Sequence, residues 1–346
     1  MTAELQRFKQ LIAKAATGAR LELEEAKEAF ALMMGGNATP AQMAGLLMAL
    51  RVRGETIEEI TAGALTLRER MTTISAPEGA IDTCGTGGDA AGTYNISTAA
   101  ALVVAGAGVP VAKHGNRSLS SKSGSAEVLA QLGVNIDAGF ALIEEAIREA
   151  RIGFMMAPRH HGAMRHVAGP RVELGTRTIF NLLGPLANPA GVKRQLMGVF
   201  AAEWVEPLAQ VLGRLGARFA WVVHGRDGLD ELTTTGPTLV AEWDGSGVRT
   251  FEVTPEDAGL PRARLEDLKG DEPAHNAEAI RAVLTGVKGP FRDAVVMGAA
   301  GALLVAGRAE TLREGARLAA ESIDGGAALQ ALETLVRITN GPAPVS

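Results

Sequence analysis

The sequence predicts an α/β protein, in which a small all-helical N-terminal domain precedes a larger α/β domain with a mostly parallel central sheet. Residues 1–72 carry helical patterns only, whereas short apolar segments alternate with helical patterns after Pro77. Such alternation is typical of strand–helix–strand units around a parallel sheet. The 42 glycines in 346 residues exceed the usual share of roughly 7%. So many glycines indicate tight turns, or places where the backbone approaches a ligand closely.

The N-terminal region contains two well-marked helices. The threonine–proline pair at 39–40 supplies an N-cap and a first-turn proline, and Gly54 ends that helix. Thr56 and Glu59 form a capping box, which predicts a second helix running to about residue 71. These helices are too few to enclose a large core. We therefore expect a homodimer in which apolar side chains pack against a symmetry mate as well as their own chain; they are Met43, Leu46, Leu47 and Leu50.

The region after residue 73 predicts the sheet. Strands are expected at Ala80–Cys84, Val109–Lys113, Gly153–Ala157, Gln195–Phe200 and Phe219–His224, with helices beginning at Ser97 and Ser125. A hairpin at Thr238–Val253 turns on the glycine-rich segment 244–247. Alanine-rich helical patterns return from Asn276. The domains are thus expected at 1–72 and 73–346.

Composition excludes several functional classes. The net charge of −5 disfavours a nucleic-acid or membrane partner, because phosphate-rich surfaces demand a basic footprint. Aromatic residues make up 4%, too few for base-stacking platforms. The single cysteine, Cys84, excludes an internal disulfide and is interpreted as a packed core thiol. The absence of a signal-like or membrane-spanning apolar run predicts a cytoplasmic protein.

Histidines at 160, 161 and 166 suggest zinc at first sight. His161 and His166 are five residues apart, so they lie on roughly opposite sides of a helix, and no cysteine or acid stands at ligand spacing. We do not expect zinc.

Two glycine-rich loops each follow a predicted strand and open a helix. The first runs Gly-Thr-Gly-Gly-Asp from Gly85 to Asp89 and continues to the helix at Ser97. The second runs Lys-His-Gly-Asn-Arg-Ser from Lys113 to Ser118. Glycines expose backbone N–H groups, and helix N-termini carry partial positive charge, so both loops suit phosphate. Either loop alone could be a plain turn or a solvated charge cluster, but together they indicate a polyanionic ligand.

An acidic pair, Asp230 and Glu231, follows the strand that ends at His224. Such pairs are usually solvated surface. Beside two phosphate loops, however, the pair predicts Mg²⁺, because a diphosphate close to carboxylates needs a cation between them.

Six motifs in order carry a family resemblance: Gly-Thr-Gly-Gly-Asp, Asn-x-Ser-Thr, Lys-His-Gly-Asn-Arg, Ser-Gly-Ser-Ala, Arg-Thr-Ile-Phe-Asn-x-x-Gly-Pro-Leu-x-Asn-Pro and Leu-Asp-Glu. Together they resemble the anthranilate phosphoribosyltransferase family over essentially the whole chain. The resemblance implies a helical dimerisation domain, to which segment 170–187 crosses back, and a nucleoside-phosphorylase-like α/β domain that binds phosphoribosyl pyrophosphate (PRPP). It further implies transfer of the phosphoribosyl group to anthranilate in tryptophan biosynthesis, with release of pyrophosphate.

The resemblance also implies site residues. PRPP would contact Gly85, Gly88, Asp89, Thr93, Asn95, Ile96, Ser97, Thr98, Lys113, His114, Gly115, Asn116, Arg117, Ser118, Leu119, Ser120, Ser121 and Ser125. Two Mg²⁺ ions per subunit would be held by Ser97, Asp230 and Glu231. Anthranilate would meet Gly85, Asn116, Ala157, Pro158, His161 and Arg171. The sequence departs from the family pattern at Gly162, commonly proline, and at 168–170, where a Pro-Val pair usually precedes the arginine.

These assignments imply a mechanism. Carbon–oxygen cleavage runs ahead of attack, as in glycoside hydrolysis, while the metal and Lys113 stabilise the departing charge. Arg171 holds the anthranilate carboxylate, and His114 is a candidate base for the amine proton. Arg171 could instead be a surface arginine paired with Glu173 or another acid. Two other functions stay open: a nucleoside phosphorylase, which the acidic pair disfavours, and a non-catalytic nucleic-acid-binding relative, which the net charge disfavours.

Overall fold

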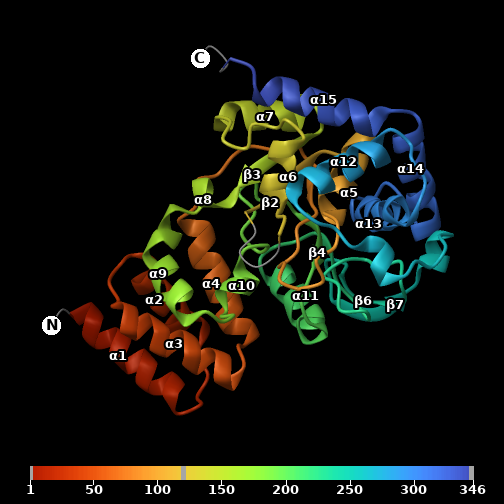
Figure 1. Ribbon diagram of the computed structural model, residues 1–346. Coiled ribbons are helices and arrows are strands. Elements are labelled where there is room, and N and C mark those ends of the chain that lie inside the picture. Colours follow the sequence, from red (N-terminus) through yellow and green to blue (C-terminus); the bar gives the residue numbers. More distant parts are fainter. Residues whose placement is uncertain (1–2, 118–121, 343–346) are drawn as a thin grey trace. The chain divides into compact units, whose positions relative to one another are not determined.

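The computed structural model describes residues 3–117 and 122–342 (Figure 1). The chain divides into two compact units. One comprises the chain up to Thr73 together with Ala157–Pro189, and the other comprises Ile74–Met156 and the chain from Ala190 onward. The family resemblance implied that segment 170–187 crosses back to the helical domain. The segment grouped with the helical unit is longer, and it begins at Ala157, the first residue of α8, directly after strand β3. None of the helices in the described ranges combines the length and apolar character needed to cross a bilayer.

The helical unit is built from α1 Ala3–Ala16, α2 Leu23–Met34, α3 Pro40–Arg53, α4 Ile57–Glu69, α8 Ala157–His160, α9 Arg165–Leu174 and α10 Phe180–Leu183, with a 3-10 turn η1 at Gly162–Met164. Both predicted caps are present. The Thr39 side chain accepts a hydrogen bond from the Gln42 N–H, and Thr56 and Glu59 form a reciprocal capping box. Helix α4 ends at Glu69, two residues short of the expected end.

The helices of this unit pack in pairs, α1 with α3, α2 with α4, α3 with α9 and α4 with α10. The four apolar side chains expected to reach a symmetry mate are already buried by their own chain, with exposures of 0–3%; they are Met43, Leu46, Leu47 and Leu50. A partner would have to contact other residues. Val52 on α3 and Val172 on α9 are 82% and 79% exposed, which makes them candidates for such a contact.

The second unit contains a seven-stranded sheet in the order β3-β2-β1-β4-β5-β6-β7. Its first five strands in that order are mutually parallel, and β6 and β7 add an antiparallel hairpin. The strands are β1 Ile81–Asp82, β2 Val111–Gly115, β3 Ile152–Met156, β4 Arg194–Gly198, β5 Phe219–Gly225, β6 Thr238–Trp243 and β7 Val248–Val253. All were predicted, with end shifts of at most two residues. Strand β2 starts late because Pro110 has no N–H to donate to the ladder.

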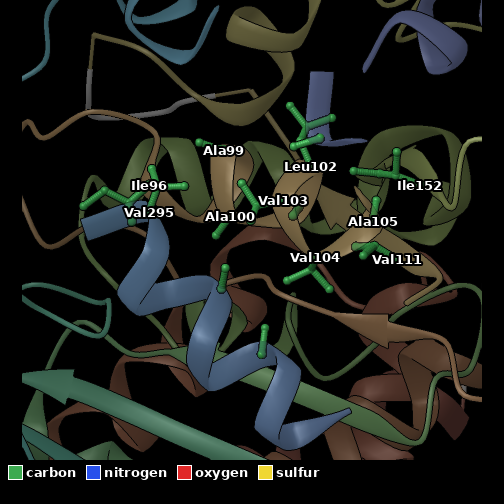
Figure 2. Close-up of a cluster of buried hydrophobic side chains, with 14 of the residues drawn as sticks. Ile96, Ala99, Ala100, Leu102, Val103, Val104, Ala105, Val111, Ile152 and Val295 are labelled. Atoms are coloured by element: carbon green, nitrogen blue, oxygen red, sulfur yellow. The ribbon is translucent and has the colours of Figure 1, made fainter. Parts of the chain in front are cut away.

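The helices of this unit are α5 Ile96–Gly106, α6 Ser125–Gln131, α7 Phe140–Glu149, α11 Val205–Arg214, α12 Pro273–Leu284, α13 Pro290–Val305, α14 Leu312–Asp324 and α15 Ala327–Thr339, with 3-10 turns η2 Ala202–Trp204, η3 Pro255–Ala258 and η4 Leu265–Leu268. Helix α13 packs on both α5 and α14, and α5 also packs on α15. Figure 2 shows apolar α5 side chains of this core, among them Ile96, Leu102 and Val104, with Val295 of α13 beside Ile96.

The two faces of the sheet are covered by different helices. Trp221 and Val223 of β5 belong to the core that contains α5 and α13, whereas Ala220 and Val222 are buried outside that core. Alternate residues of a strand point to opposite faces. Helix α11 packs on β5 and β6 and therefore covers the second face. Helices therefore cover both faces of the sheet, as expected for parallel strands.

Candidate active site

Strand β1 lies at the point where the strand order reverses, since the chain proceeds from β1 outward to β2 and β3 and then returns to β4 on the other side. Ligands of open α/β sheets bind beyond the carboxyl ends of the strands at such a switch point. The first glycine loop follows β1, the Lys113 motif occupies the end of β2, and the acidic pair follows β5. The fold therefore brings the three predicted motifs to one edge of the sheet.

Hydrogen bonds join the acidic pair to the first glycine loop. The Gly87 N–H donates to Oδ2 of Asp230 at 2.8 Å, and the Ser97 N–H donates to Oε1 of Glu231 at 3.0 Å. Ser97 lies in the first turn of α5, where backbone N–H groups have no intrahelical partner. Two N–H groups that suit a phosphate are therefore held by carboxylates in this structure. Asp230, Glu231 and Ser97, predicted together as metal ligands, are neighbours.

This close approach depends on glycine at the end of β4. A Cβ placed on Gly198 would stand 1.6 Å from the backbone oxygen of Asp230. One on Gly85 would stand 2.7 Å from Oδ2 of the same residue. Glycine at these two positions allows Asp230 to lie against the end of β4 and the loop after β1. Gly85, predicted as a ligand contact, thus also makes room for Asp230.

The acids repel one another. Burial raises the pKa of Asp230 well above its ordinary value, and the charges of Asp89 and Glu231 raise it further. Burial also raises the pKa of Glu231, although the nearby Lys113 ammonium and the Ser97 hydrogen bonds oppose that shift. Clustered carboxylates with raised pKa values are stabilised by a cation.

The donor set fits a hard divalent ion. Carboxylate and hydroxyl oxygens are the ligands that Mg²⁺ prefers, and it usually keeps waters and substrate phosphates in its remaining positions. Within the described ranges, no three His, Cys, Asp or Glu side chains form a group that could hold a metal by themselves. The protein would therefore supply part of the coordination, and phosphate and water the rest. A small cavity lined by Ser97, Glu231 and Thr83 lies beside the acids.

Hydrogen bonds to Asp82 and Thr83, at the end of β1, hold Lys113 and His114 in place. Lys113 is 2% exposed, and its Nζ donates to the Thr83 carbonyl at 3.1 Å. The backbone N–H of His114 donates to Oδ1 of the buried Asp82 at 3.2 Å. Burial of Cys84 raises its thiol pKa well above the ordinary value, and Asp82 adds to the effect. This supports the interpretation of Cys84 as an inert core thiol.

The loop after β2 folds back onto helix α6. The Asn116 carbonyl accepts from the Ser125 hydroxyl at 3.3 Å and from the Ala126 N–H at 3.4 Å. Gly124 is the N-cap of α6, with no side-chain cap bond. Four predicted contacts lie outside the described residues; they are Ser118, Leu119, Ser120 and Ser121. Strand β2 ends at Gly115, and Asn116 and Arg117 are the first residues of the loop that follows.

The rest of the first loop leads from Asp89 to the N-terminus of α5. The Ala91 N–H bonds to Oδ1 of Asp89 at 3.1 Å, and Asn95 is the N-cap residue of α5. Ile96 and Thr98 are each 1% exposed. Gly88 has a positive φ of 79°, and Thr93 forms a bridge to Lys269.

The predicted anthranilate residues of the helical unit lie in two short elements. Ala157 and Pro158 begin α8, and His161 follows it. His161 is 5% exposed; burial lowers its pKa to about 4, assisted by the neighbouring charge of His160 and opposed by a hydrogen bond to Ala187. The imidazole is therefore neutral at pH 7. Gly162, which departs from the family pattern, opens the turn η1.

Arg171 lies on α9 with its guanidinium 5.4 Å from the ring centroid of Phe180. This is cation–π geometry. Burial lowers the Arg171 pKa from its ordinary value. Within the described part of the chain no ion pair joins Arg171 to Glu173, so the surface-pair alternative receives no support. Pro170, another departure, sits inside α9 and is buried.

Sequence reasoning missed three residues of this site. Gly198 lies inside the strand predicted at 195–200 and ends the observed β4, and a glycine at that position was the available signal of a close approach. Asp82 is an acid inside a buried strand, which is itself anomalous. Asn276, which bonds to Asn95, gave no signal, because the partners are 181 residues apart.

Comparisons with known proteins were made on the whole chain. Residues 77–329 match the glycosyl transferase family, a/b domain, and residues 9–71 match the glycosyl transferase family, helical bundle domain. The chain is 66% identical over 336 residues to anthranilate phosphoribosyltransferase of Rhodospirillum rubrum, covering 97% of each chain. It is 60% identical to the Azospirillum brasilense protein of the same name, covering 97% and 94%.

Solved structures are similar over the same length. The crystal structure of anthranilate phosphoribosyltransferase from Thermus thermophilus superposes with a TM-score of 0.91 at 46% identity, covering 96% of this chain and 99% of that one. The Saccharomyces cerevisiae enzyme in complex with PRPP and Mg has a TM-score of 0.86 at 27% identity, covering 95% and 96%.

Proposed function

Since the chain belongs to the anthranilate phosphoribosyltransferase family, within the glycosyl transferases, we propose that its α/β unit binds PRPP and Mg²⁺ and that it transfers the phosphoribosyl group to anthranilate. The products are N-(5-phosphoribosyl)anthranilate and pyrophosphate, and the reaction is a step of tryptophan biosynthesis. The nucleoside-phosphorylase and nucleic-acid-binding alternatives lose their support, because relatives at 58–66% identity carry the transferase name.

One observation carries the proposal for the α/β unit. The acidic pair lies against the phosphate-type loop of β1 and the N-terminus of α5, with the Lys113 charge close to Glu231. A diphosphate needs N–H donors and a cation, whereas its metal needs carboxylates, and both requirements are met within one cluster.

The difficult part of the reaction is the departure of pyrophosphate. As the bond between C1 and the diphosphate oxygen breaks, negative charge grows on that oxygen and the ribose gains oxocarbenium character. Bound Mg²⁺, held by Ser97, Asp230 and Glu231, would neutralise the charge of the diphosphate. Lys113 is fixed by the Thr83 carbonyl, so it needs no reorganisation to stabilise the same charge.

Binding of PRPP uses the remaining loop residues. We assign the contacts to the backbone and side chains from Gly85 to Thr98, to the segment from Lys113 through Arg117, and to Ser125. Asn95, Thr93 and Asp89 are polar residues of the first segment. Contacts from the segment 118–121 remain an expectation of the family resemblance. Two Mg²⁺ ions per subunit are part of the same proposal.

The acceptor requires a cation and an apolar surface. Arg171 would bind the anthranilate carboxylate by a charge-assisted bond, and its contact with Phe180 restricts the guanidinium. His161, neutral at pH 7, would line the aromatic ring together with Ala157 and Pro158, while Gly85 and Asn116 are proposed contacts on the α/β unit. A neutral imidazole adds no charge to compete with Arg171 for the carboxylate.

His114 is proposed as the base that accepts the proton of the amine. Its backbone is fixed by Asp82, and it is 4% exposed. The proton is acidic once the new C–N bond exists, so loss of this base should slow turnover modestly.

We also propose a cytoplasmic homodimer formed by the helical unit. The exposed Val52 and Val172 on the packed helices α3 and α9 support a contact surface there. Light scattering at micromolar concentration should give twice the mass of the 35.9 kDa chain, and a monomer would refute the dimer.

The function is tested by mixing the protein with PRPP, Mg²⁺ and anthranilate and following the loss of anthranilate fluorescence. One pyrophosphate should appear for each anthranilate consumed, and omission of PRPP should stop both signals. Phosphorolysis of purine or pyrimidine nucleosides is measured in parallel. Nucleoside cleavage without consumption of anthranilate would overturn the proposal in favour of a phosphorylase.

A further inference from the structure

The buried amide of Asn276 is bonded to the phosphate-binding loop from outside the glycine motifs. It lies in the first turns of α12 and is 1% exposed. Its Nδ2 donates to Oδ1 of Asn95 at 3.0 Å, and its Oδ1 accepts from the Asp271 N–H at 2.8 Å. Asn95 in turn donates from Nδ2 to the Ser123 carbonyl at 3.3 Å. These contacts form a continuous chain from Asp271 to Ser123.

The direction of each bond in this chain is fixed by its ends. A backbone N–H can only donate, so the Asp271 N–H requires Oδ1 of Asn276 on its side. The Nδ2 of Asn276 must then face Asn95, which can meet it only with Oδ1. The backbone carbonyl of Ser123 can only accept, and it independently requires the Nδ2 of Asn95 on the opposite side.

We propose that Asn276 is a positioning residue that fixes the amide orientation of Asn95, so that Asn95 presents its remaining N–H donor and not its carbonyl oxygen to the phosphates of PRPP. The inference rests on the proposed function in taking Asn95 as a PRPP contact. An amide nitrogen carries two hydrogens, of which Ser123 uses one. A reversed amide would place an acceptor oxygen toward an anion, which is repulsive.

The segment that leads into α12 supports this role. Its Gly270 N–H donates to the Gly92 carbonyl at 2.9 Å, and the Tyr94 N–H donates to the Leu268 carbonyl at 3.0 Å. A Cβ on Gly270 would stand 2.8 Å from both Oδ1 of Asn276 and the backbone of the loop at 93–94. Contacts to its backbone at Gly92 and Tyr94 and to the Asn95 side chain therefore hold the first glycine loop in place.

The substitution Asn276→Asp tests the proposal with almost no change of volume. One carboxylate oxygen still accepts from the Asp271 N–H, but the other faces Oδ1 of Asn95 and favours reversal of that amide. The KM for PRPP should rise on the order of tenfold or more, as for loss of a hydrogen bond to a charged group. The KM for anthranilate should change by no more than about twofold.

Two controls separate positioning from general damage. Ile280→Val removes one methylene from a fully buried side chain of the same helix and does not touch the amide chain. It should lower the melting temperature and leave both KM values unchanged. If the Asn276→Asp variant does not fold, Asn276→Ala is the second variant. It removes the donor without forcing reversal of the Asn95 amide, so it should raise the KM for PRPP less than Asn276→Asp does.

The decisive measurement is a double-mutant cycle with Asn95→Ala. If Asn276 acts through the Asn95 amide, Asn276→Asp should raise the PRPP dissociation constant by less than about twofold once that amide is gone. An equal effect in both backgrounds, or an equal rise in both KM values, would overturn the inference. Calorimetric binding of PRPP with Mg²⁺ gives the dissociation constants without turnover. If the wild type binds PRPP but does not react with anthranilate, anthranilate is not the acceptor. The test of Asn276 still applies in that case, because it measures PRPP binding alone.

Discussion

The Gly87 N–H donates a 2.8 Å hydrogen bond to Oδ2 of Asp230, a residue 143 positions further along the chain. The Ser97 N–H makes the equivalent bond to Glu231. Donors suited to phosphate are thus held by the carboxylates proposed to bind the metal. Phosphate and carboxylate compete for the same N–H groups, and a cation that neutralises the carboxylates favours the exchange. We therefore expect metal binding and diphosphate binding to be coupled.

The crowding of acids predicts a trade-off between stability and function. Replacing Asp230 with Asn and Glu231 with Gln removes charge that burial and Asp89 disfavour, and amide oxygens can still accept from Gly87 and Ser97. We expect the metal-free variant to be as stable as wild type or about 1 kcal/mol more stable, which is roughly 2–4 °C in Tm. Its turnover with Mg²⁺ should fall by orders of magnitude.

The control for this variant is Glu256→Gln with Asp257→Asn, an exposed adjacent pair in the same unit. It removes the same charge and should leave turnover unchanged. A marked loss of stability in the Asp230/Glu231 variant would show that these carboxylates are structural.

Gly198→Ala should abolish the site. The added Cβ would stand 1.6 Å from the Asp230 backbone oxygen, so either the strand or the acidic loop must move. We expect destabilisation of about 2 kcal/mol or more and a PRPP affinity reduced at least tenfold in the fraction that folds. Gly236→Ala is the matched control, because nothing lies within 4 Å of its Cβ position. Urea unfolding and calorimetry of both variants test this, and a Gly198→Ala protein with wild-type affinity would contradict the proposed geometry.

Arg171→Ala should separate the two substrates. Loss of a charge-assisted contact costs on the order of 1.5–3 kcal/mol, so the KM for anthranilate should rise roughly tenfold or more, while that for PRPP stays nearly constant. Arg165→Ala on the same helix, where the side chain is exposed, should change neither. Equal weakening toward both substrates would indicate a folding defect and remove Arg171 from the acceptor site.

The buried His161 predicts an acid-sensitive stability. Its pKa is about 4 when folded, below the ordinary value of 6.5. The unfolded chain binds the extra proton in this range, so the free energy of unfolding falls as pH drops from 6.5 to about 4, by at most ~3 kcal/mol. His161→Phe should lose less stability than wild type across this range in urea unfolding. His166→Gln, a half-buried neighbour, is the control, and parallel pH profiles for His161→Phe and wild type would contradict the assignment.

Local signals made most of the fold predictable. The caps at Thr39 and Thr56 and the alternation of β-type segments fixed the elements, because capping and periodicity depend on near neighbours. The start of α6 has no such side-chain cap, since the Ser123 and Ser125 hydroxyls bond to Asn95 and to the Asn116 carbonyl and not to the helix N-terminus.

The site was predictable as motifs and not as contacts. Glycines and acids at strand ends marked the three loops, but the pairing of Gly87 with Asp230 depends on the strand order, which no local pattern encodes. Asn276 is the clearest case: a single amide on a distant helix carries no chemical signature until the fold places it against Asn95.

The account is tested most directly by calorimetric titration of PRPP into the wild-type protein and into the Asp230→Asn, Glu231→Gln variant across a range of Mg²⁺ concentrations. The wild type should bind PRPP more tightly as Mg²⁺ rises and, by linkage, bind Mg²⁺ more tightly when PRPP is present. The variant should lose most of this coupling. Equal PRPP affinity in both proteins at every Mg²⁺ concentration would contradict the claim that the acidic pair brings the metal to the diphosphate.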